Sequence, residues 1–222
     1  MLELSIMPEL SYNGGPSLAP QENDLQRLYQ LLIERRATTV LEFGCGYSSW
    51  VIQEALKENK AWFADKDVQI RNPHLFQGFS VDTNRDWVKD CRAKIPDITF
   101  SVSPCQVDLF NTQLCHMYLK IPDIVPDFIY LDGPDPKQVT GDMNNLTFEH
   151  RTPMASDILL MEPTLIPGTA VLVDGRTNNV RFLRKNLRRT WWFQEEDDTA
   201  LMILDESKLG YVNAVGRDIL GS

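Results

Sequence analysis

The chain has 222 residues, of which 43% are hydrophobic, and a formal net charge of −9. The hydrophobic content is typical of a packed domain and excludes a disordered chain. Because nucleic-acid-binding proteins usually carry a broad basic face, the negative charge argues against a nucleic-acid partner. No apolar run approaches the ~20 residues of a membrane span, and the start of the chain lacks a basic-then-apolar signal pattern. We therefore expect no membrane partner.

The cysteines indicate the compartment. The four of them show neither CxxC spacing nor histidine partners at zinc-finger intervals. Reduced thiols in a cytoplasmic protein are the simplest interpretation.

The first part of the chain predicts a leader, a helix and a strand. Residues 1–20 are rich in Pro, Gly and Ser, and residues 21–36 place leucines at helical spacing. Residues 38–46 are typical of a buried strand that runs into a glycine turn. Ser48 or Ser49 would cap the helix that follows.

Strands and helices then alternate to the end of the chain. After an insertion at 60–77, we predict strands at 78–83, 98–102, 127–133 and 169–175, helices at 84–95, 153–166 and 178–189, a loop with a short helix before 127, and a closing hairpin at 190–205. This order indicates parallel βαβ units with right-handed crossovers. We predict a doubly wound α/β sheet in a single domain, with its core at 38–204 after a leader and helix at 1–36.

Acidic residues follow four of the predicted parallel strands. Glu42 ends the first, Asp82 the second, Asp132 and Asp135 the fourth, and Asp174 the fifth. A single carboxylate at a strand end is often only a turn former. Ligands of such sheets bind beyond the carboxyl ends of the strands, however, so these carboxylates should converge on one crevice.

The glycine turn after the first strand is the first candidate ligand contact. Gly44 and Gly46 let the backbone turn sharply and approach a ligand, and the helix after Ser48 points its positive end at that space. Glu42 would repel a dinucleotide pyrophosphate and attract an ammonium group. The alternative is that the glycines serve only a tight turn.

Asp82 is the candidate for binding the two hydroxyls of a ribose. It lies farther from Gly46 than the ~20 residues usual for a dinucleotide unit, and Asp65 stands at that spacing instead. We prefer Asp82 because a strand, a turn and a helix start surround it.

Four motifs in this order resemble those of class I S-adenosylmethionine-dependent methyltransferases over about residues 38–204. They are LEFGCG (41–46), SVDTNRDWV (80–88), FIYLDGPDP (128–136) and VLVDG (171–175). The resemblance implies a Rossmann-like, mostly parallel seven-stranded sheet with a C-terminal antiparallel hairpin, and S-adenosylmethionine as cofactor. The cofactor-binding residues that it implies are Glu42, Gly44, Gly46, Ser48, Asp82, Ser103, Gln106 and Asp132. Ser103 to Gln106 would lie near the adenine. The family often has an acidic residue at the last of these positions, but this chain has Gln106 there, and its nearest acidic residue, Asp108, comes two positions later.

The stretch LDGPDPKQVTGD (131–142) also resembles the metal-assisted sugar O-methyltransferases. That resemblance implies Mg²⁺ held by Asp132 and Asp174 against two acceptor oxygens. The pattern's second carboxylate after strand five is Gly175 here, and Asp135 would have to compensate for it. The alternative is that both aspartates only cap turns.

Together, the two resemblances imply O-methylation of a small-molecule or glycan acceptor. The enzyme must align the acceptor oxygen and help to remove its proton. A metal would lower the hydroxyl pKa, and without one Asp132 or His150 would be the general base. The alternatives are a nicotinamide-dependent oxidoreductase and an inactive cofactor-binding module. The aromatic cluster Trp191-Trp192-Phe193 fits either the sheet core or the contact of a homo-oligomer.

Overall fold

A seven-stranded sheet forms the centre of the computed structural model, which describes residues 2–12, 15–16, 19–66, 70, 72–141, 143 and 153–208. The strand order is β12-β13-β11-β8-β3-β4-β5. The parallel strands are β3 (Thr39–Phe43), β4 (Gln77–Asp82), β5 (Ile98–Val102), β8 (Phe128–Leu131) and β11 (Ala170–Asp174). The closing hairpin of β12 (Trp191–Glu196) and β13 (Thr199–Leu204) adds to β11 in antiparallel orientation. The predicted Rossmann-like sheet is confirmed.

The strand order reverses between β3 and β8. From β3 the chain winds outward through β4 to β5, and from β8 it winds in the opposite direction to β11. Ligands of open α/β sheets bind at such a switch point, outside the carboxyl ends of the strands. At the opposite ends, the Asp127 carboxylate accepts hydrogen bonds from the backbone N–H groups of Thr38 and Thr39, which ties the starts of β3 and β8 together.

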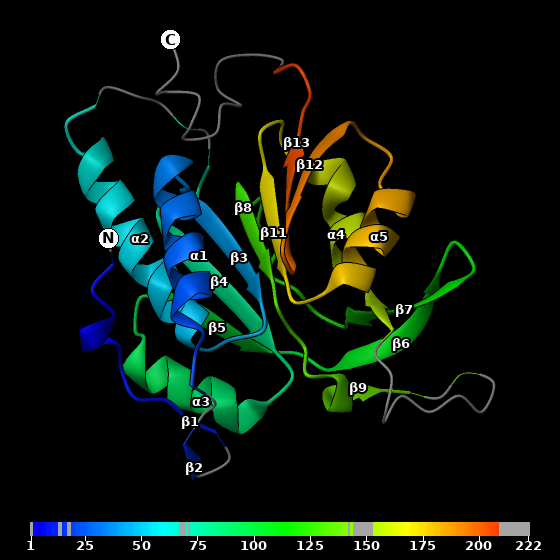
Figure 1. Cartoon of the computed structure of the whole chain (residues 1–222), viewed down its shortest axis with the longest axis horizontal. Coiled ribbons are helices and arrows are strands. Elements are labelled where there is room, and N and C mark those ends of the chain that lie inside the picture. Colours follow the sequence, from blue (N-terminus) through cyan, green and yellow to red (C-terminus); the bar gives the residue numbers. More distant parts are fainter. Residues whose placement is uncertain are drawn as a thin grey trace.

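Helices cover both faces of the sheet (Figure 1). α1 (Glu22–Glu34), α2 (Tyr47–Phe63) and α3 (Arg85–Lys94) pack on one face, and α4 (Asp157–Met161) and α5 (Thr177–Asn186) pack on the other. No helix in the described part of the chain is long and apolar enough to cross a membrane.

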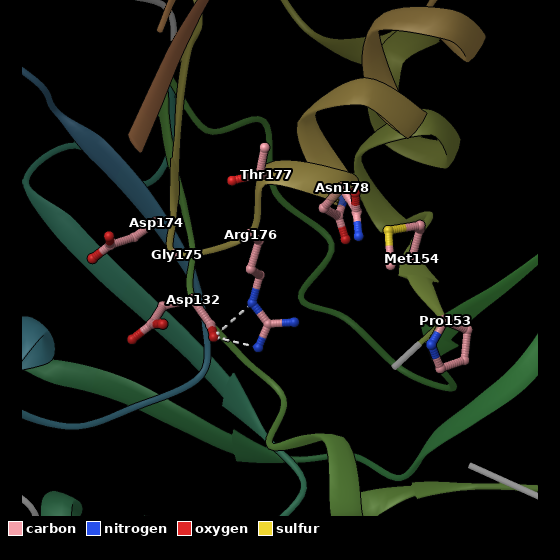
Figure 2. A pocket seen from close by; sticks show the side chains of 9 residues that line it. Asp132, Pro153, Met154, Asp174, Gly175, Arg176, Thr177 and Asn178 are labelled. Carbon is pink, nitrogen blue, oxygen red and sulfur yellow. Dashed lines mark hydrogen bonds between the residues drawn. The ribbon is translucent and has the colours of Figure 1, made fainter. Parts of the chain in front are cut away.

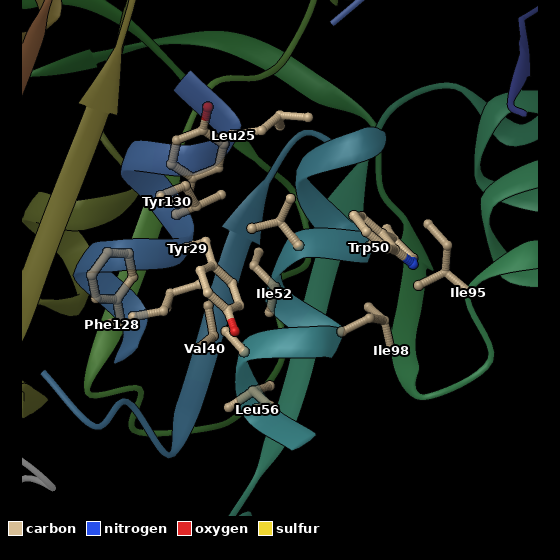
Figure 3. Close-up of a cluster of buried hydrophobic side chains, with 14 of the residues drawn as sticks. Leu25, Tyr29, Val40, Trp50, Ile52, Leu56, Ile95, Ile98, Phe128 and Tyr130 are labelled. Carbon is tan, nitrogen blue, oxygen red and sulfur yellow. The ribbon is translucent and has the colours of Figure 1, made fainter. Parts of the chain in front are cut away.

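Successive side chains of each strand point to opposite faces of the sheet, and this alternation produces two separate hydrophobic cores. Val40 points toward α1 and α2, whereas Leu41 and Phe43 point toward α4 and α5. Figure 3 shows the first core, where Tyr29 of α1 and Ile52 of α2 gather over the strands. Each such side chain contributes roughly 1.5–3 kcal/mol when fully buried.

The prediction of a loop and a short helix between β5 and β8 is wrong. This connection forms a hairpin of β6 (Cys105–Phe110) and β7 (Gln113–Tyr118), and β9 (Val139–Thr140) and β10 (Met154–Ala155) extend it to a second, four-stranded sheet. The two-residue turn of this hairpin, Asn111-Thr112, has φ values of 50° and 64°, the conformation that matches the twist of paired strands.

Short elements complete the description. The helix predicted at 153–166 is shorter, because β10 precedes α4 and a 3₁₀ turn, η3 (Glu162–Thr164), follows it. The leader contains η1 (Leu4–Ile6), β1 (Ser11–Tyr12) and β2 (Gly15–Pro16), and η2 (Pro136–Gln138) follows β8. In the aromatic cluster of β12, Trp191 and Phe193 pack against the second core, and Trp192 is exposed.

Candidate functional site

A cleft of about 740 Å³ opens at the switch point. The turn after β3, the end of β4, the loop after β8 and the end of β11 form its floor, and the start of α1 forms a wall. Seven of the candidate residues named from the sequence line it: Gly44, Gly46, Ser48, Asp82, Asp132, Asp135 and Asp174.

Two glycines bring the ends of β3 and β8 into contact. Gly44 has a φ of +97°, and a Cβ on Gly133 would lie 2.5 Å from the Gly44 Cα. The Gly133 N–H also donates to the Phe43 carbonyl oxygen at 2.6 Å. Glycine is therefore needed at Gly44 because the backbone of Gly133 lies against it, and a side chain at either position would force the two segments apart.

Glu42, on β3, lies beneath the floor of the cleft and is not among its lining residues. Its side chain is 1% exposed, and its two oxygens accept hydrogen bonds from Ser48 Oγ, at 2.5 Å, and from Ser49 Oγ. Burial raises the pKa of this carboxyl to about 7. Glu42 thus positions Ser48, which does line the cleft, and gives no support to the predicted repulsion of a dinucleotide at this residue.

Asp82 reaches the cleft from the end of β4. Its carboxylate accepts from the backbone N–H of Cys45 at 3.2 Å and of Asn84 at 2.7 Å, and burial raises its pKa. The alternative residue, Asp65, is exposed in the turn after α2 and does not line the cleft.

The two residues expected near adenine lie away from the cleft lining. Ser103 is 1% exposed, and its Oγ accepts from the Lys120 N–H at 2.9 Å, while Gln106 pairs with Met117 within the unpredicted hairpin. The hairpin begins at Cys105 and carries the chain away from the place where a loop was expected.

Aromatic residues that the sequence did not single out line the cleft instead. Trp87 of α3 donates from Nε1 to the Cys45 carbonyl oxygen at 2.5 Å, and Tyr47 is the first residue of α2. Trp87 belongs to the SVDTNRDWV motif, so its position next to Asp82 is a signal that could have identified it.

A second cavity of about 560 Å³ adjoins the first. Asp132, Asp174, Gly175 and Arg176 line both, and Met154 lies on the far side of the second cavity (Figure 2). The Arg176 side chain crosses this border and joins the loops after β8 and β11.

Three hydrogen bonds hold Arg176 in this place. Its Nε donates to the Asp132 carbonyl oxygen at 2.9 Å, and its Nη2 donates to the carbonyl oxygens of Asp132 at 2.5 Å and of Pro134 at 2.7 Å. The guanidinium is thus bonded to backbone, which fixes the loop that carries Asp132.

Asp132 combines access to water with a dense protein surrounding. Its side chain is exposed to the two cavities, yet protein atoms crowd around the carboxylate. The surrounding protein atoms reduce the solvation of the carboxylate, and this effect, followed by repulsion from Asp174, raises the pKa of Asp132 to about 6, against the opposing effect of Arg176. The group is mostly ionised at neutral pH but binds a proton more readily than an ordinary carboxylate, which suits a general base.

The predicted magnesium site is not supported. Within the described ranges, no group of three or more His, Cys, Asp or Glu side chains is arranged to hold a metal ion. Asp174 instead accepts a hydrogen bond from the Tyr130 hydroxyl at 2.7 Å. The other predicted base, His150, lies outside the described residues.

The lining of the first cleft is strongly acidic. It includes a single cationic residue, Arg176, among the described residues. The carboxylates in it are Asp24, Asp82, Asp132, Asp135, Asp174 and Asp198. Sequence reasoning missed Asp24, within an amphipathic helix, and Asp198, within an acidic turn. Such a cleft attracts cations and repels phosphates.

Several solved methyltransferases have a similar structure. The methyltransferase PaMTH1 of Podospora anserina, solved with bound S-adenosylhomocysteine, matches with a TM-score of 0.52 at 13% identity, over 85% of this chain and 80% of that one. The O-methyltransferase TomG of Streptomyces achromogenes, solved with S-adenosylmethionine, matches with a TM-score of 0.47 at 16% identity, over 86% and 84%. No protein-family model and no curated protein matches the sequence. The likeness to PaMTH1 shows that the chain has the Rossmann-like fold of S-adenosylmethionine-dependent methyltransferases.

Proposed function

We propose that the protein is an S-adenosylmethionine-dependent methyltransferase that acts on a hydroxyl group of a small acceptor. The observation that carries this proposal is the charge of the cleft, whose lining holds six aspartates and one arginine. S-adenosylmethionine has a sulfonium, an ammonium and one carboxylate, so its net charge is positive. A nicotinamide dinucleotide would instead bring a pyrophosphate into this negative field. The fold supports the same choice.

The residues of the first cleft fit the cofactor. Asp82 would accept the ribose hydroxyls from the end of β4, while Trp87 offers an aromatic face beside it. Gly46 leaves the start of α2 without a side chain, where a Cβ would meet only the Trp87 ring, at 3.4 Å. When bound, the cofactor supplies a methyl group on a sulfonium centre that oxygen nucleophiles can attack.

The second cavity would hold the acceptor. Asp132 lies on the border between the two cavities, where it can take the proton of an acceptor hydroxyl as the oxygen attacks. Arg176 donates two hydrogen bonds to the Asp132 carbonyl oxygen and so holds the backbone that carries this carboxylate. The Thr177 hydroxyl and the Asn178 amide in the lining are compatible with a polyhydroxylated acceptor such as a sugar.

Thermal melts with S-adenosylhomocysteine and, separately, with NAD test the proposal. A ligand at 100 times its dissociation constant adds about 2.7 kcal/mol, or roughly 5–10 °C in Tm for a chain of this size. We expect a shift with S-adenosylhomocysteine alone. A shift with NAD alone would refute the proposal in favour of the oxidoreductase.

Two variants make the test specific to the ribose. Asp82→Asn removes a charge-assisted hydrogen bond worth about 1.5–3 kcal/mol and should weaken S-adenosylhomocysteine binding, whereas the matched control Asp65→Asn should not. Equal affinity of Asp82→Asn and wild type would overturn the ribose assignment. Binding without methyl transfer to any of a broad panel of acceptors would favour the inactive module.

A further inference from the structure

The buried position of Glu42 leaves one group of the proposed cofactor without a partner. The sequence assigned Glu42 to the ammonium group, but both of its oxygens accept from serine hydroxyls of α2, and its side chain is 1% exposed. A carboxylate that meets the ammonium group must lie in the cleft lining. A different carboxylate of the lining is therefore the candidate partner for this group.

Helix α1 brings such a carboxylate to the cleft from a different direction. Asp24, in the first turn of α1, lines the cleft with its side chain 19% exposed. Asp174, at the end of β11, and Asp198, in the turn between β12 and β13, line it as well. The Gly175 N–H donates to the Asp198 carbonyl oxygen at 3.2 Å, which holds that turn against the end of β11. We call Asp24, Asp174 and Asp198 the acidic trio.

The trio is only partly neutralised. Arg27 contacts Asp24 through one long Nη1–Oδ1 distance of 3.3 Å, and the same Nη1 donates to Thr199 Oγ1 at 3.3 Å. Asp174 accepts a hydrogen bond from the Tyr130 hydroxyl, which carries no positive charge. Burial, followed by repulsion from Asp174 and Asp198, raises the pKa of Asp24 despite Arg27. A cation placed among the three carboxylates would relieve this repulsion.

The position of the trio along the sheet suits the amino-acid end of the ligand. β4, which ends at Asp82, and β11, which ends at Asp174, lie on opposite sides of the switch point (Figure 1). A ligand whose ribose meets Asp82 and which extends over the ends of β3 and β8 therefore runs toward the trio. An ammonium group has three N–H donors, enough to reach more than one carboxylate.

We infer that Asp24, together with Asp174 and Asp198, binds the ammonium group of the cofactor's amino-acid part, in the place that the sequence pattern assigns to Glu42. This inference rests on the proposed function. It makes the N-terminal helix part of the cofactor site and Asp24 a residue that distinguishes ligands with a free amino group.

Isothermal titration calorimetry with two ligands tests the inference. S-adenosylhomocysteine carries the ammonium group, whereas 5′-deoxy-5′-methylthioadenosine keeps the adenosine and the thioether but lacks the amino-acid part. We expect Asp24→Asn to weaken S-adenosylhomocysteine binding about tenfold to a hundredfold, as for the loss of a charge-assisted hydrogen bond, and to leave methylthioadenosine binding unchanged. Asp198→Asn, in an exposed turn, should show the same selective loss.

Glu22→Gln is the matched control. Glu22 is the other acidic residue in the first turn of α1, but it is exposed and does not line the cleft, so its loss removes a similar interaction with the helix dipole. Both ligands should bind this variant as they bind the wild type.

The outcomes separate this inference from the proposed function. If the wild type binds S-adenosylhomocysteine and Asp24→Asn binds it equally well, the inference fails and the proposed function stands. Equal losses for both ligands would also overturn it, because they indicate a general disturbance of the cleft. A wild type that binds neither ligand would overturn both.

Discussion

Replacing Glu42 by Gln should change how the stability of the protein depends on pH. The carboxyl is buried, and its pKa is raised from 4.5 to about 7 because it has lost contact with water. Between these two pH values, the folded protein holds a proton that the unfolded chain has released. The free energy of unfolding therefore falls as the pH rises through this window.

The size of the effect follows from the same two values. The difference between 4.5 and about 7, at 1.36 kcal/mol for each pH unit, amounts to roughly 3 kcal/mol. Gln keeps an oxygen acceptor for one serine and carries no ionisable proton. Relative to the wild type, Glu42→Gln should thus gain roughly 3 kcal/mol between pH 4 and pH 8, or roughly 6–12 °C in Tm.

Differential scanning calorimetry at pH 4 and pH 8 measures this gain. The comparison must be between variant and wild type, because Asp157, whose pKa burial also raises to about 7, titrates in both proteins. Glu34→Gln, at the exposed end of α1, serves as the control and should follow the wild type. If the Tm values of Glu42→Gln and wild type moved in parallel with pH, Glu42 would not be a desolvated carboxyl behind the cleft.

Two further substitutions address the border between the cavities. Gly133→Ala should lower the free energy of unfolding measured in urea by at least about 3 kcal/mol, because the new Cβ would lie 2.5 Å and 2.6 Å from backbone atoms of Gly44. In the control Gly175→Ala, the new Cβ has no atom within 4 Å, so the loss should be only the ~1–2 kcal/mol that a positive φ of +61° costs an alanine. Equal losses in the two variants would contradict the close contact at Gly133. Asp132→Asn should abolish methyl transfer to any acceptor that the wild type methylates and leave S-adenosylhomocysteine affinity within a few-fold; an active variant would exclude Asp132 as the base.

The sheet could be predicted because its signals are local. Each parallel strand is a short apolar run, and Gly44 or an aspartate marks the carboxyl end of most of them, so alternation with helices determines the architecture. The same reasoning located Asp82 and Asp132 at the cleft, since parallel strands end at one edge. Neither step requires knowledge of how distant side chains pack.

The missed features depend on information that the local sequence lacks. Asn111-Thr112 forms a hairpin turn with positive φ at both residues but without the glycine that usually reveals one. Glu42 was expected in the cleft because it stands two residues before Gly44 in the sequence. Its side chain is instead turned to two serines of the next helix, a contact that the local sequence does not reveal. Asp24 gives no local signal, because only tertiary packing brings α1 to the cleft.

The hydrogen bonds of the aspartates distinguish turn-capping residues from those left to bind a ligand. Asp82 and Asp135 accept from backbone N–H groups within two residues of themselves, as turn formers do. Within the described part of the chain, no backbone N–H donates to the carboxylate of Asp132 or Asp174. Turn capping therefore accounts for the presence of Asp135 and in part for that of Asp82. It does not account for Asp132 and Asp174, on the border of the cavities. Loss of solvation and, after it, repulsion from Asp174 raise the pKa of Asp132, and a cation in the cleft would offset this repulsion.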